Sequence, residues 1–233
     1  MGKVKSVSVL SAVAMIALQT ASLSECRADE VVKVCDFENS AAGTLAKGCR
    51  TGVTNADSLP LWQVVQRSDA PSGRHVLVMK RPAVTGGLFG IGSVFNLCYC
   101  PDVSLEDLKA TVSFKSLTGD EDRGGGIVWR MADENNYYVA RFNPLEDNFR
   151  FYYVKDGTRV MIASAKVVLK DNGWHTMSVV QRGDRFEGYI DGKKLLSAVD
   201  GHIKGAGVVG LWTKADAVTL FDDFRLYRIK GQR

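Results

Sequence analysis

Residues 124–158 read GGGIVWRMADENNYYVARFNPLEDNFRFYYVKDGT, and this stretch decides the fold. Apolar and polar side chains alternate along it, as they do in strands that bury only one face. The segment Pro144–Asp147 interrupts the alternation with loop residues, and Asp156-Gly157 is a common hairpin dipeptide. We therefore expect a β meander of consecutive antiparallel strands.

The two turns place this meander in register. The loop sets Arg141 opposite Arg150, and the second turn sets Phe151 opposite Ile162. One face is then apolar and is the expected core face of a sandwich: Tyr138, Ala140, Phe142, Phe149, Phe151, Tyr153, Val160 and Ile162. The other face holds Asn143, Asn148, Arg141, Arg150, Val139, Tyr152, Arg159 and Met161. A slip of one residue would carry the arginines into the core, so the register is strongly specified.

The rest of the mature chain also reads as β structure. Turn signals recur about every 8 to 12 residues, as an all-β sandwich or barrel requires. We expect further strands at residues 31–38, 61–66, 75–81, 109–115, 158–164, 174–182, 185–191, 193–199, 208–214 and 218–227. Only Ser104–Leu108 could form a short helical turn. No linker or repeat marks a second domain.

The first 28 residues are expected to be a secretory signal peptide. Lys3 and Lys5 form a positive start, an apolar stretch too short to span a bilayer follows, and small residues precede a cleavage point near Ala28. The alternative is a lipoprotein anchor at Cys26, for which the preceding glutamate is unfavourable. We expect residues 29–233 to be exported to the periplasm or cell exterior, without a membrane span.

Composition argues against a nucleic-acid partner. The formal net charge is +4, and 24% of the residues are charged. Lysine and arginine are dispersed among aspartate and glutamate, and no basic stripe carries interleaved aromatic residues.

The mature chain keeps four cysteines, Cys35, Cys49, Cys98 and Cys100. In an exported protein such cysteines are usually disulfides. Cys98 and Cys100 are two apart, so on a strand they point to the same side and do not easily bridge each other. Each is expected to pair with Cys35 or Cys49, and the sequence leaves open which with which. The alternative is a metal site on the C-x-C pair, which lacks a histidine at zinc spacing.

The polar face of the meander is the expected ligand site. Arg141 opposite Arg150 is unfavourable unless an anion lies between them. That anion is either a carboxylate of an adjacent strand or an acidic or hydroxyl-rich ligand. We expect ligand contacts from Arg141, Arg150, Tyr152, Asn143 and Tyr137, because tyrosine rings stack on sugars while arginine and asparagine bind hydroxyls.

A buried carboxylate near the C-terminus suggests a structural ion. Asp222 shares strand parity with Leu220 and Phe224, so it is expected to point inward. A buried carboxylate needs a cation or several donors. It could pair with an arginine, or hold a structural calcium together with Asp36 and Glu38.

Five segments carry a family resemblance: GGGIVWR, NNYYVARFNPLEDNFRFY, GWHTMSV, YIDGKKL and GLWTKADAVTLFDDF. They resemble the concanavalin A-like, laminin-G-type jelly rolls of exported bacterial proteins, close to the domain family named for 3-keto-disaccharide hydrolases. The resemblance covers roughly Val31 to Tyr227. It implies an all-β jelly-roll sandwich of two antiparallel sheets, with ligands on the concave face or the rim loops.

No complete catalytic signature accompanies the resemblance. The hydrolase-type members tend to have Asn-Ser-Gly where this chain has Gly124-Gly125-Gly126, and the alternating acidic residues of the glucanase branch are missing. We therefore expect a carbohydrate-binding or cell-envelope module. The alternative is a hydrolase acting on 3-keto sugars, with His175, Glu146 or Asp147 as its base.

Overall fold

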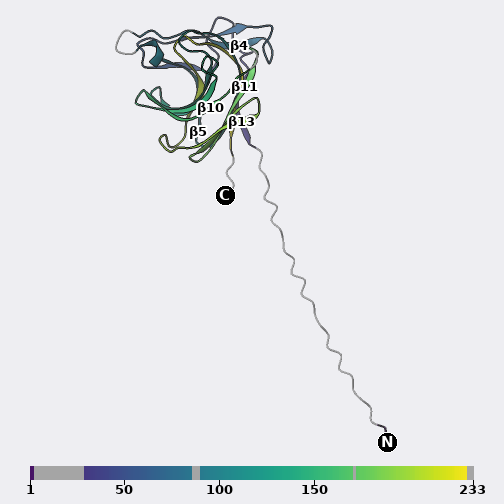
Figure 1. Ribbon diagram of the computed structural model, residues 1–233. Coiled ribbons are helices and arrows are strands. Elements are labelled where there is room, and N and C mark those ends of the chain that lie inside the picture. Colours follow the sequence, from purple (N-terminus) through teal and green to yellow (C-terminus); the bar gives the residue numbers. More distant parts are fainter. Residues whose placement is uncertain (3–28, 86–89, 170–171, 230–233) are drawn as a thin grey trace.

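The computed structural model describes residues 1–2, 29–85, 90–169 and 172–229. Almost the whole expected signal peptide therefore lies outside the described residues. Two antiparallel sheets are stacked on each other (Figure 1), which confirms the predicted all-β sandwich. Among the described residues the one helical element is the 3-10 turn Ile91–Ser93, and no helix is long and apolar enough to cross a membrane.

Sheet A has the strand order β13-β12-β11-β6-β15-β4-β3, and β1 pairs with β15 outside this path. Its strands are β1 Glu30–Cys35, β3 Leu61–Gln66, β4 His75–Arg81, β6 Leu108–Thr118, β11 His175–Arg182, β12 Arg185–Ile190, β13 Lys193–Val199 and β15 Val218–Arg228. Sheet B has the order β10-β9-β8-β7-β14-β5-β2. Its strands are β2 Arg50–Thr54, β5 Phe95–Leu105, β7 Gly125–Asp133, β8 Asn136–Asn143, β9 Asn148–Lys155, β10 Thr158–Lys166 and β14 Gly207–Lys214.

Most predicted strands are present, and β3 and β4 have the predicted bounds. Two strands of sheet B, β2 and β5, were not predicted from the sequence. Strand β5 contains Pro101, which argues against a strand in a sequence pattern. The helical turn predicted at Ser104–Leu108 is wrong, because these residues end β5 and begin β6.

The core lies between the two sheets and is rich in aromatic rings. Trp129 stacks on Tyr138 with ring centroids 5.6 Å apart and meets Phe186 of sheet A edge-on at 5.7 Å. The predicted register of β8 with β9 is confirmed from Asn143 opposite Asn148 to Val139 opposite Tyr152. The predicted core residues of these two strands are buried there, except for the half-buried Tyr153: Tyr138, Ala140, Phe142, Phe149 and Phe151.

The predicted register of β9 with β10 is wrong beyond Met161. Phe151 lies opposite Ala163 instead of Ile162, because a bulge inserts an extra residue after Met161. Ile162 is therefore only half-buried. Val160, also predicted to be in the core, is 39% exposed. Strand β10 is an edge strand, where bulges are common, and alternation alone does not reveal an inserted residue.

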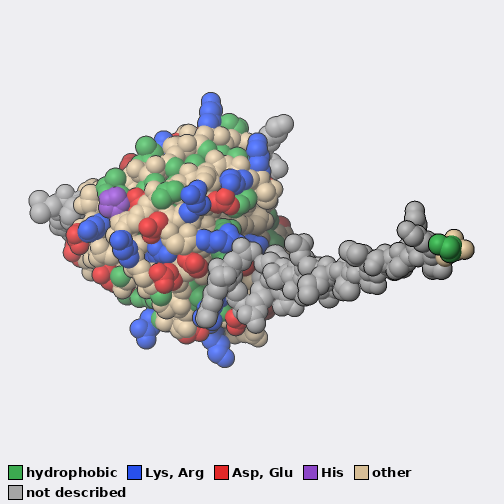
Figure 2. Space-filling view, turned by 90° about the horizontal axis from the view of Figure 1, so that it is seen from below, with side chains coloured by type: hydrophobic (Ala, Val, Ile, Leu, Met, Phe, Trp, Pro, Cys, Tyr) green, Lys and Arg blue, Asp and Glu red, His purple; other side chains and the backbone are tan. Residues whose placement is uncertain are grey.

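Cys35, Cys49, Cys98 and Cys100 are free thiols in this structure, so it does not contain the predicted disulfides. Their sulfur atoms nevertheless meet at one edge of the core, as described below. Basic and acidic side chains are interspersed over the face drawn in Figure 2, as the small net charge suggests.

Candidate ligand site on sheet B

Sheet B carries a second apolar cluster on the side that faces away from the core. We call this side the rolled face, and its buried residues are Phe95, Leu97, Val128, Met131, Tyr137, Val139, Tyr152, Val154 and Trp212. Arg159 of edge strand β10 lies over three of these rings. Its guanidinium carbon is 4.4 Å from the ring centroid of Tyr152, 5.1 Å from that of Phe95 and 5.8 Å from that of Trp212.

These contacts require sheet B to be strongly curved. In the strand order, β10 and β5 are separated by four other strands, which is about 24 Å in a flat sheet. An arginine side chain does not span that distance, so the sheet rolls until its edges approach. Asn55, which follows β2 at one edge, donates a hydrogen bond of 3.0 Å to the carbonyl of Gly157 in the turn before β10. The rolled face is therefore concave.

The deep part of the rolled face is filled by the protein's own side chains. Tyr137 is fully buried, and its hydroxyl group is 2.9 Å from the hydroxyl of Thr54 and accepts from the indole of Trp212 at 3.3 Å. Burial raises the pKa of Tyr137 and lowers that of Arg159. Tyr137, predicted to bind ligand, thus has no free ring face in this structure.

One end of the rolled face is polar, and the loop between β8 and β9 folds over it. The β8–β9 loop occupies Pro144–Asp147 as predicted. The side chain of Asn143 accepts a 2.8 Å hydrogen bond from the backbone of Leu145, which turns the chain, and Asp147 adopts the left-handed region with φ 49°. This geometry folds Glu146 back over strands β8 and β9.

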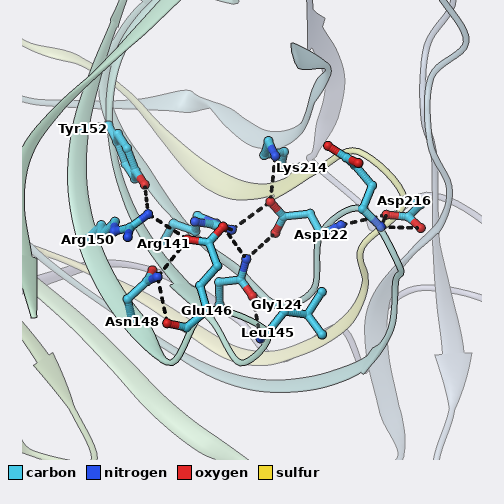
Figure 3. A network of polar contacts seen from close by, with 12 residues as sticks. Asp122, Gly124, Arg141, Leu145, Glu146, Asn148, Arg150, Tyr152, Lys214 and Asp216 are labelled. Carbon is cyan, nitrogen blue, oxygen red and sulfur yellow. Dashed lines mark hydrogen bonds and ion pairs between the residues drawn. The ribbon is translucent and has the colours of Figure 1, made fainter. Parts of the chain in front are cut away.

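Glu146 is the anion that separates the two facing arginines. Its carboxylate accepts from Arg141 Nη2 at 3.3 Å and from Arg150 Nη1 at 2.7 Å (Figure 3). The anion is thus a carboxylate, although it comes from the hairpin loop and not from an adjacent strand. Asn148 donates a further 2.8 Å hydrogen bond to it. Four of the five predicted ligand residues lie in this network. Arg141, Arg150 and Asn143 contact Glu146, and the hydroxyl of Tyr152 contacts Arg150.

A second carboxylate lies deeper in the same network. Asp122 accepts from Arg141 Nη2 at 2.8 Å and pairs with Lys214 Nζ at 3.0 Å. Asp122 and Arg141 are each 1% exposed. Asp216 holds the backbone before β7 by accepting from the amides of Asp120 and Asp122 at 2.7 Å and 3.0 Å. Sequence patterns did not reveal these three partners. Asp122 and Asp216 lie in loops, where a position gives no side-chain direction, and Lys214 ends strand β14, whose place beside β7 depends on the tertiary fold.

The outer part of the network is accessible. The side chains of Glu146 and Arg150 are 43% and 29% exposed. Burial raises the pKa of Glu146, but the hydrogen bond from Asn148 and the charges of Arg141 and Arg150 outweigh it and lower the pKa to about 2. Glu146 is therefore ionised at neutral pH.

Several buried polar atoms of the rolled face have no hydrogen-bonding partner within the described protein. They are Arg141 Nε, Asn148 Oδ1 and Arg159 Nη1. A buried donor or acceptor without a partner costs about 1–3 kcal/mol. A ligand hydroxyl that reached these atoms would recover part of that free energy.

The predicted calcium ligands are satisfied by protein donors. Asp222 is fully buried and accepts from the backbone amides of Ser72 and Asp223 at 3.0 Å and 2.7 Å. Glu38 accepts from the amides of Arg74 and His75, and Asp36 accepts from the amide of Glu38.

These carboxylates do not fit calcium as they are arranged. Within the described ranges no group of three or more histidine, cysteine, aspartate or glutamate side chains could hold a metal ion. Calcium remains a prediction, which a chelator that leaves the Tm of the purified protein unchanged would exclude.

Asp222, Leu220 and Phe224 were predicted to share one face of a strand, and a bulge makes this prediction wrong. Asp223 has φ 49°, and the pairing of β15 with β6 shifts between Asp222 and Arg225. Leu220 consequently packs in a small cluster outside the main core, whereas Phe224 packs within it.

The stability of the protein should depend on the protonation of Asp222. Burial raises its pKa to about 6, against the donors of Ser72 and Asp223 that lower it. The folded state therefore favours the protonated form, and its contribution is lost as pH rises from 3.8 to about 6. Wild type should therefore lose stability relative to Asp222→Asn as the pH rises through this window. The difference between their free energies of unfolding should fall by at most about 3 kcal/mol. Urea unfolding at several pH values measures this difference, and a difference independent of pH would contradict it.

The candidate bases of the hydrolase alternative are not gathered in one place. His175 lies on β11 of sheet A, where its Nδ1 is 2.7 Å from Asp191 Oδ2 and its ring packs at the edge of the core near Phe114. Glu146 and Asp122 do lie together on sheet B, but Asp122 is buried. Asp147, adjacent to Glu146, is half-buried.

Comparisons with known proteins identify the fold. No protein-family model and no curated protein matches the chain. Among solved structures, it is similar to the carbohydrate-binding module CBM66 from Bacillus subtilis, with 20% identity and TM-score 0.54 over 72% of this chain and 96% of that chain. It is similar to domain 4 of a GH43 extracellular arabinanase from Geobacillus stearothermophilus in complex with arabinotriose, with 12% identity and TM-score 0.55 over 86% and 93%. It is also similar to a Bacillus licheniformis beta-glucanase, with 10% identity and TM-score 0.55 over 86% of this chain and 99% of that chain.

The chain thus has the predicted concanavalin A-like jelly-roll fold. The narrower resemblance to 3-keto-disaccharide hydrolases has no matching family model and stays a prediction.

Proposed function

We propose that this protein is an exported carbohydrate-binding module whose ligand binds at the polar end of the rolled face, over Glu146 and Arg150. The observation that carries the proposal is the accessible Glu146–Arg150 pair, whose Glu146 carboxylate also contacts the buried Arg141–Asp122 pair behind it. A fixed carboxylate and guanidinium offer acceptors and donors in a geometry that suits vicinal hydroxyls.

The fold and the N-terminal sequence support this proposal. Two of the similar structures are a carbohydrate-binding module and an arabinanase domain in complex with arabinotriose. The expected signal peptide of residues 1–28 supports export. Glu146 and Arg150 also have neighbours that could extend the contact, since Arg150 donates to Ser164 at 3.1 Å and lies 3.4 Å from the hydroxyl of Tyr152.

Glycan-array screening followed by calorimetry tests the proposal. We expect binding to at least one saccharide, and Arg150→Ala should weaken it about ten- to one-hundredfold, because a hydrogen bond from a charged group is lost. Arg150 is preferred to Arg141 for this test, since removal of the buried Arg141 would also destabilise the fold.

A matched control variant removes an arginine from another part of the molecule, so that the net charge changes by the same amount. Arg67 is a partly exposed arginine in the β3–β4 connection of sheet A, where it pairs with Asp69 at 2.8 Å. Arg67→Ala should bind the saccharide as well as wild type does. The proposal fails if no saccharide binds, or if the two variants bind equally.

The second candidate is hydrolysis of 3-keto glycosides. The observation that favours it is that two carboxylates, Glu146 and Asp122, contact the same guanidinium of Arg141. A pKa of about 2 makes Glu146 a weak base and leaves it without a proton to donate at neutral pH. Turnover of a 3-keto-glucoside that Glu146→Gln or His175→Ala abolishes would establish this activity in place of simple binding.

A further inference from the structure

Four cysteines from three separate segments meet at one edge of the core. Cys35 ends β1 of sheet A, Cys49 immediately precedes β2, and Cys98 and Cys100 lie on β5 of sheet B. The sulfur of Cys35 is 3.9 Å from that of Cys100. Cys49 lies close enough to Cys100 and Cys98 for both thiols to affect the pKa of its own thiol. Cys49 is half-buried and the other three are buried.

The geometry distinguishes between the pairings that the sequence left open. Cys98 and Cys100 both face the core, so they point the same way along β5 and do not pair with each other. The 3.9 Å contact then selects Cys35 with Cys100 and leaves Cys49 for Cys98. A zinc site would use the same four sulfurs, but in the part of the chain that the structure describes no such group is arranged to hold a metal ion.

We propose that two disulfides, Cys35–Cys100 and Cys49–Cys98, form in the exported protein. The first would join β1 of sheet A to β5 of sheet B, and the second would join the segment before β2 to β5. For each bond, two cysteine thiols give up two protons and two electrons. A disulfide-bearing oxidant in the oxidising compartment accepts them, and its own disulfide is reduced to two thiols. The inference rests on the proposed export and is independent of sugar binding.

Cys49 is suited to begin the oxidation. It is the cysteine of the four that is not fully buried, so an oxidant can reach it. The neighbouring thiols of Cys100 and Cys98, together with the charge of Lys33, lower the pKa of Cys49 below its usual range. The thiolate is the nucleophile in disulfide exchange. The mixed disulfide formed at Cys49 would then be resolved by Cys98.

Disulfide mapping of the full chain tests the proposal. The protein is purified from the oxidising compartment of a bacterial host, quenched in acid, alkylated and digested with chymotrypsin, which cleaves after Tyr99 and separates Cys98 from Cys100. We expect no alkylation of the four cysteines, and linked peptides that join Cys35 to Cys100 and Cys49 to Cys98. Reduction should lower the Tm by about 10 °C or more, since each bond restricts the unfolded chain.

A paired variant provides the control for connectivity. Cys35→Ser/Cys100→Ser should keep one disulfide and no alkylatable thiol at Cys49 or Cys98. Four free thiols, a stoichiometric zinc ion or a peptide joining Cys35 to Cys98 would each overturn the proposal. If residues 1–28 do not direct export, the proposed localisation fails. A chain exported by another signal still tests the pairing, and loss of sugar binding would leave the map unchanged.

Discussion

Asp122→Ala is expected to lower the free energy of unfolding by about 3–5 kcal/mol, because it leaves Arg141 as a buried charge without its main counter-ion. The two side chains are each 1% exposed and their Nη2 and Oδ2 atoms are 2.8 Å apart. Lys214, which contacts Asp122 at 3.0 Å, would lose its partner as well. Urea unfolding followed by circular dichroism measures the change.

The same network contains a control at its exposed end. Glu146→Ala removes a carboxylate that also contacts Arg141, but this carboxylate is 43% exposed. Water can replace it, so we expect a loss of about 0–1 kcal/mol. Similar losses for Asp122→Ala and Glu146→Ala would show that burial does not set the strength of this network.

Gly126→Ala is expected to destabilise the protein by about 3 kcal/mol, at the upper end of the range for overpacking. A Cβ atom on Gly126 would clash with the carbonyl oxygen of Ala140 on strand β8, and backbone cannot move aside as a flexible side chain can. Gly126 lies opposite Arg141 in the β7–β8 ladder, so the distortion would also reach the polar network.

Gly201→Ala is the matched control. Its added Cβ atom would meet no atom closer than 3.4 Å, and the residue does not have a positive φ angle. We expect a change within about 0.5 kcal/mol. Thermal and urea unfolding of both variants measure the contrast, and a Gly126→Ala protein as stable as Gly201→Ala would contradict the close approach of β7 to β8.

These packing contacts explain the triple glycine that opens the meander. Gly124 has φ +94°, a conformation that disfavours side chains, and Gly125 has no room for a Cβ atom beside Trp212 and Phe221. The glycines lie at the start of the central strand β7, where the neighbouring strands β8 and β14 approach closely on both sides.

Alternation predicted the meander well and failed where an extra residue enters a strand. Register is tightly specified between β8 and β9, because a slip would bury Arg141 and Arg150 in the core. The bulges after Met161 and at Asp223 change the side-chain parity beyond them. No local pattern distinguishes these residues from regular strand positions, since a bulge is stabilised by its neighbours in the sheet.

The sequence by itself determined that Arg141 and Arg150 share one face of a β sheet, because side chains alternate along a strand with a period of two. Only the tertiary structure decided what meets them there. The partners Asp122 and Lys214 come from other parts of the chain, and the roll of sheet B brings Arg159 over Phe95 and fills the hollow. Alternation assigns a side chain to a face, whereas sheet curvature and loop paths, which depend on contacts between distant residues, decide whether that face is open to a ligand.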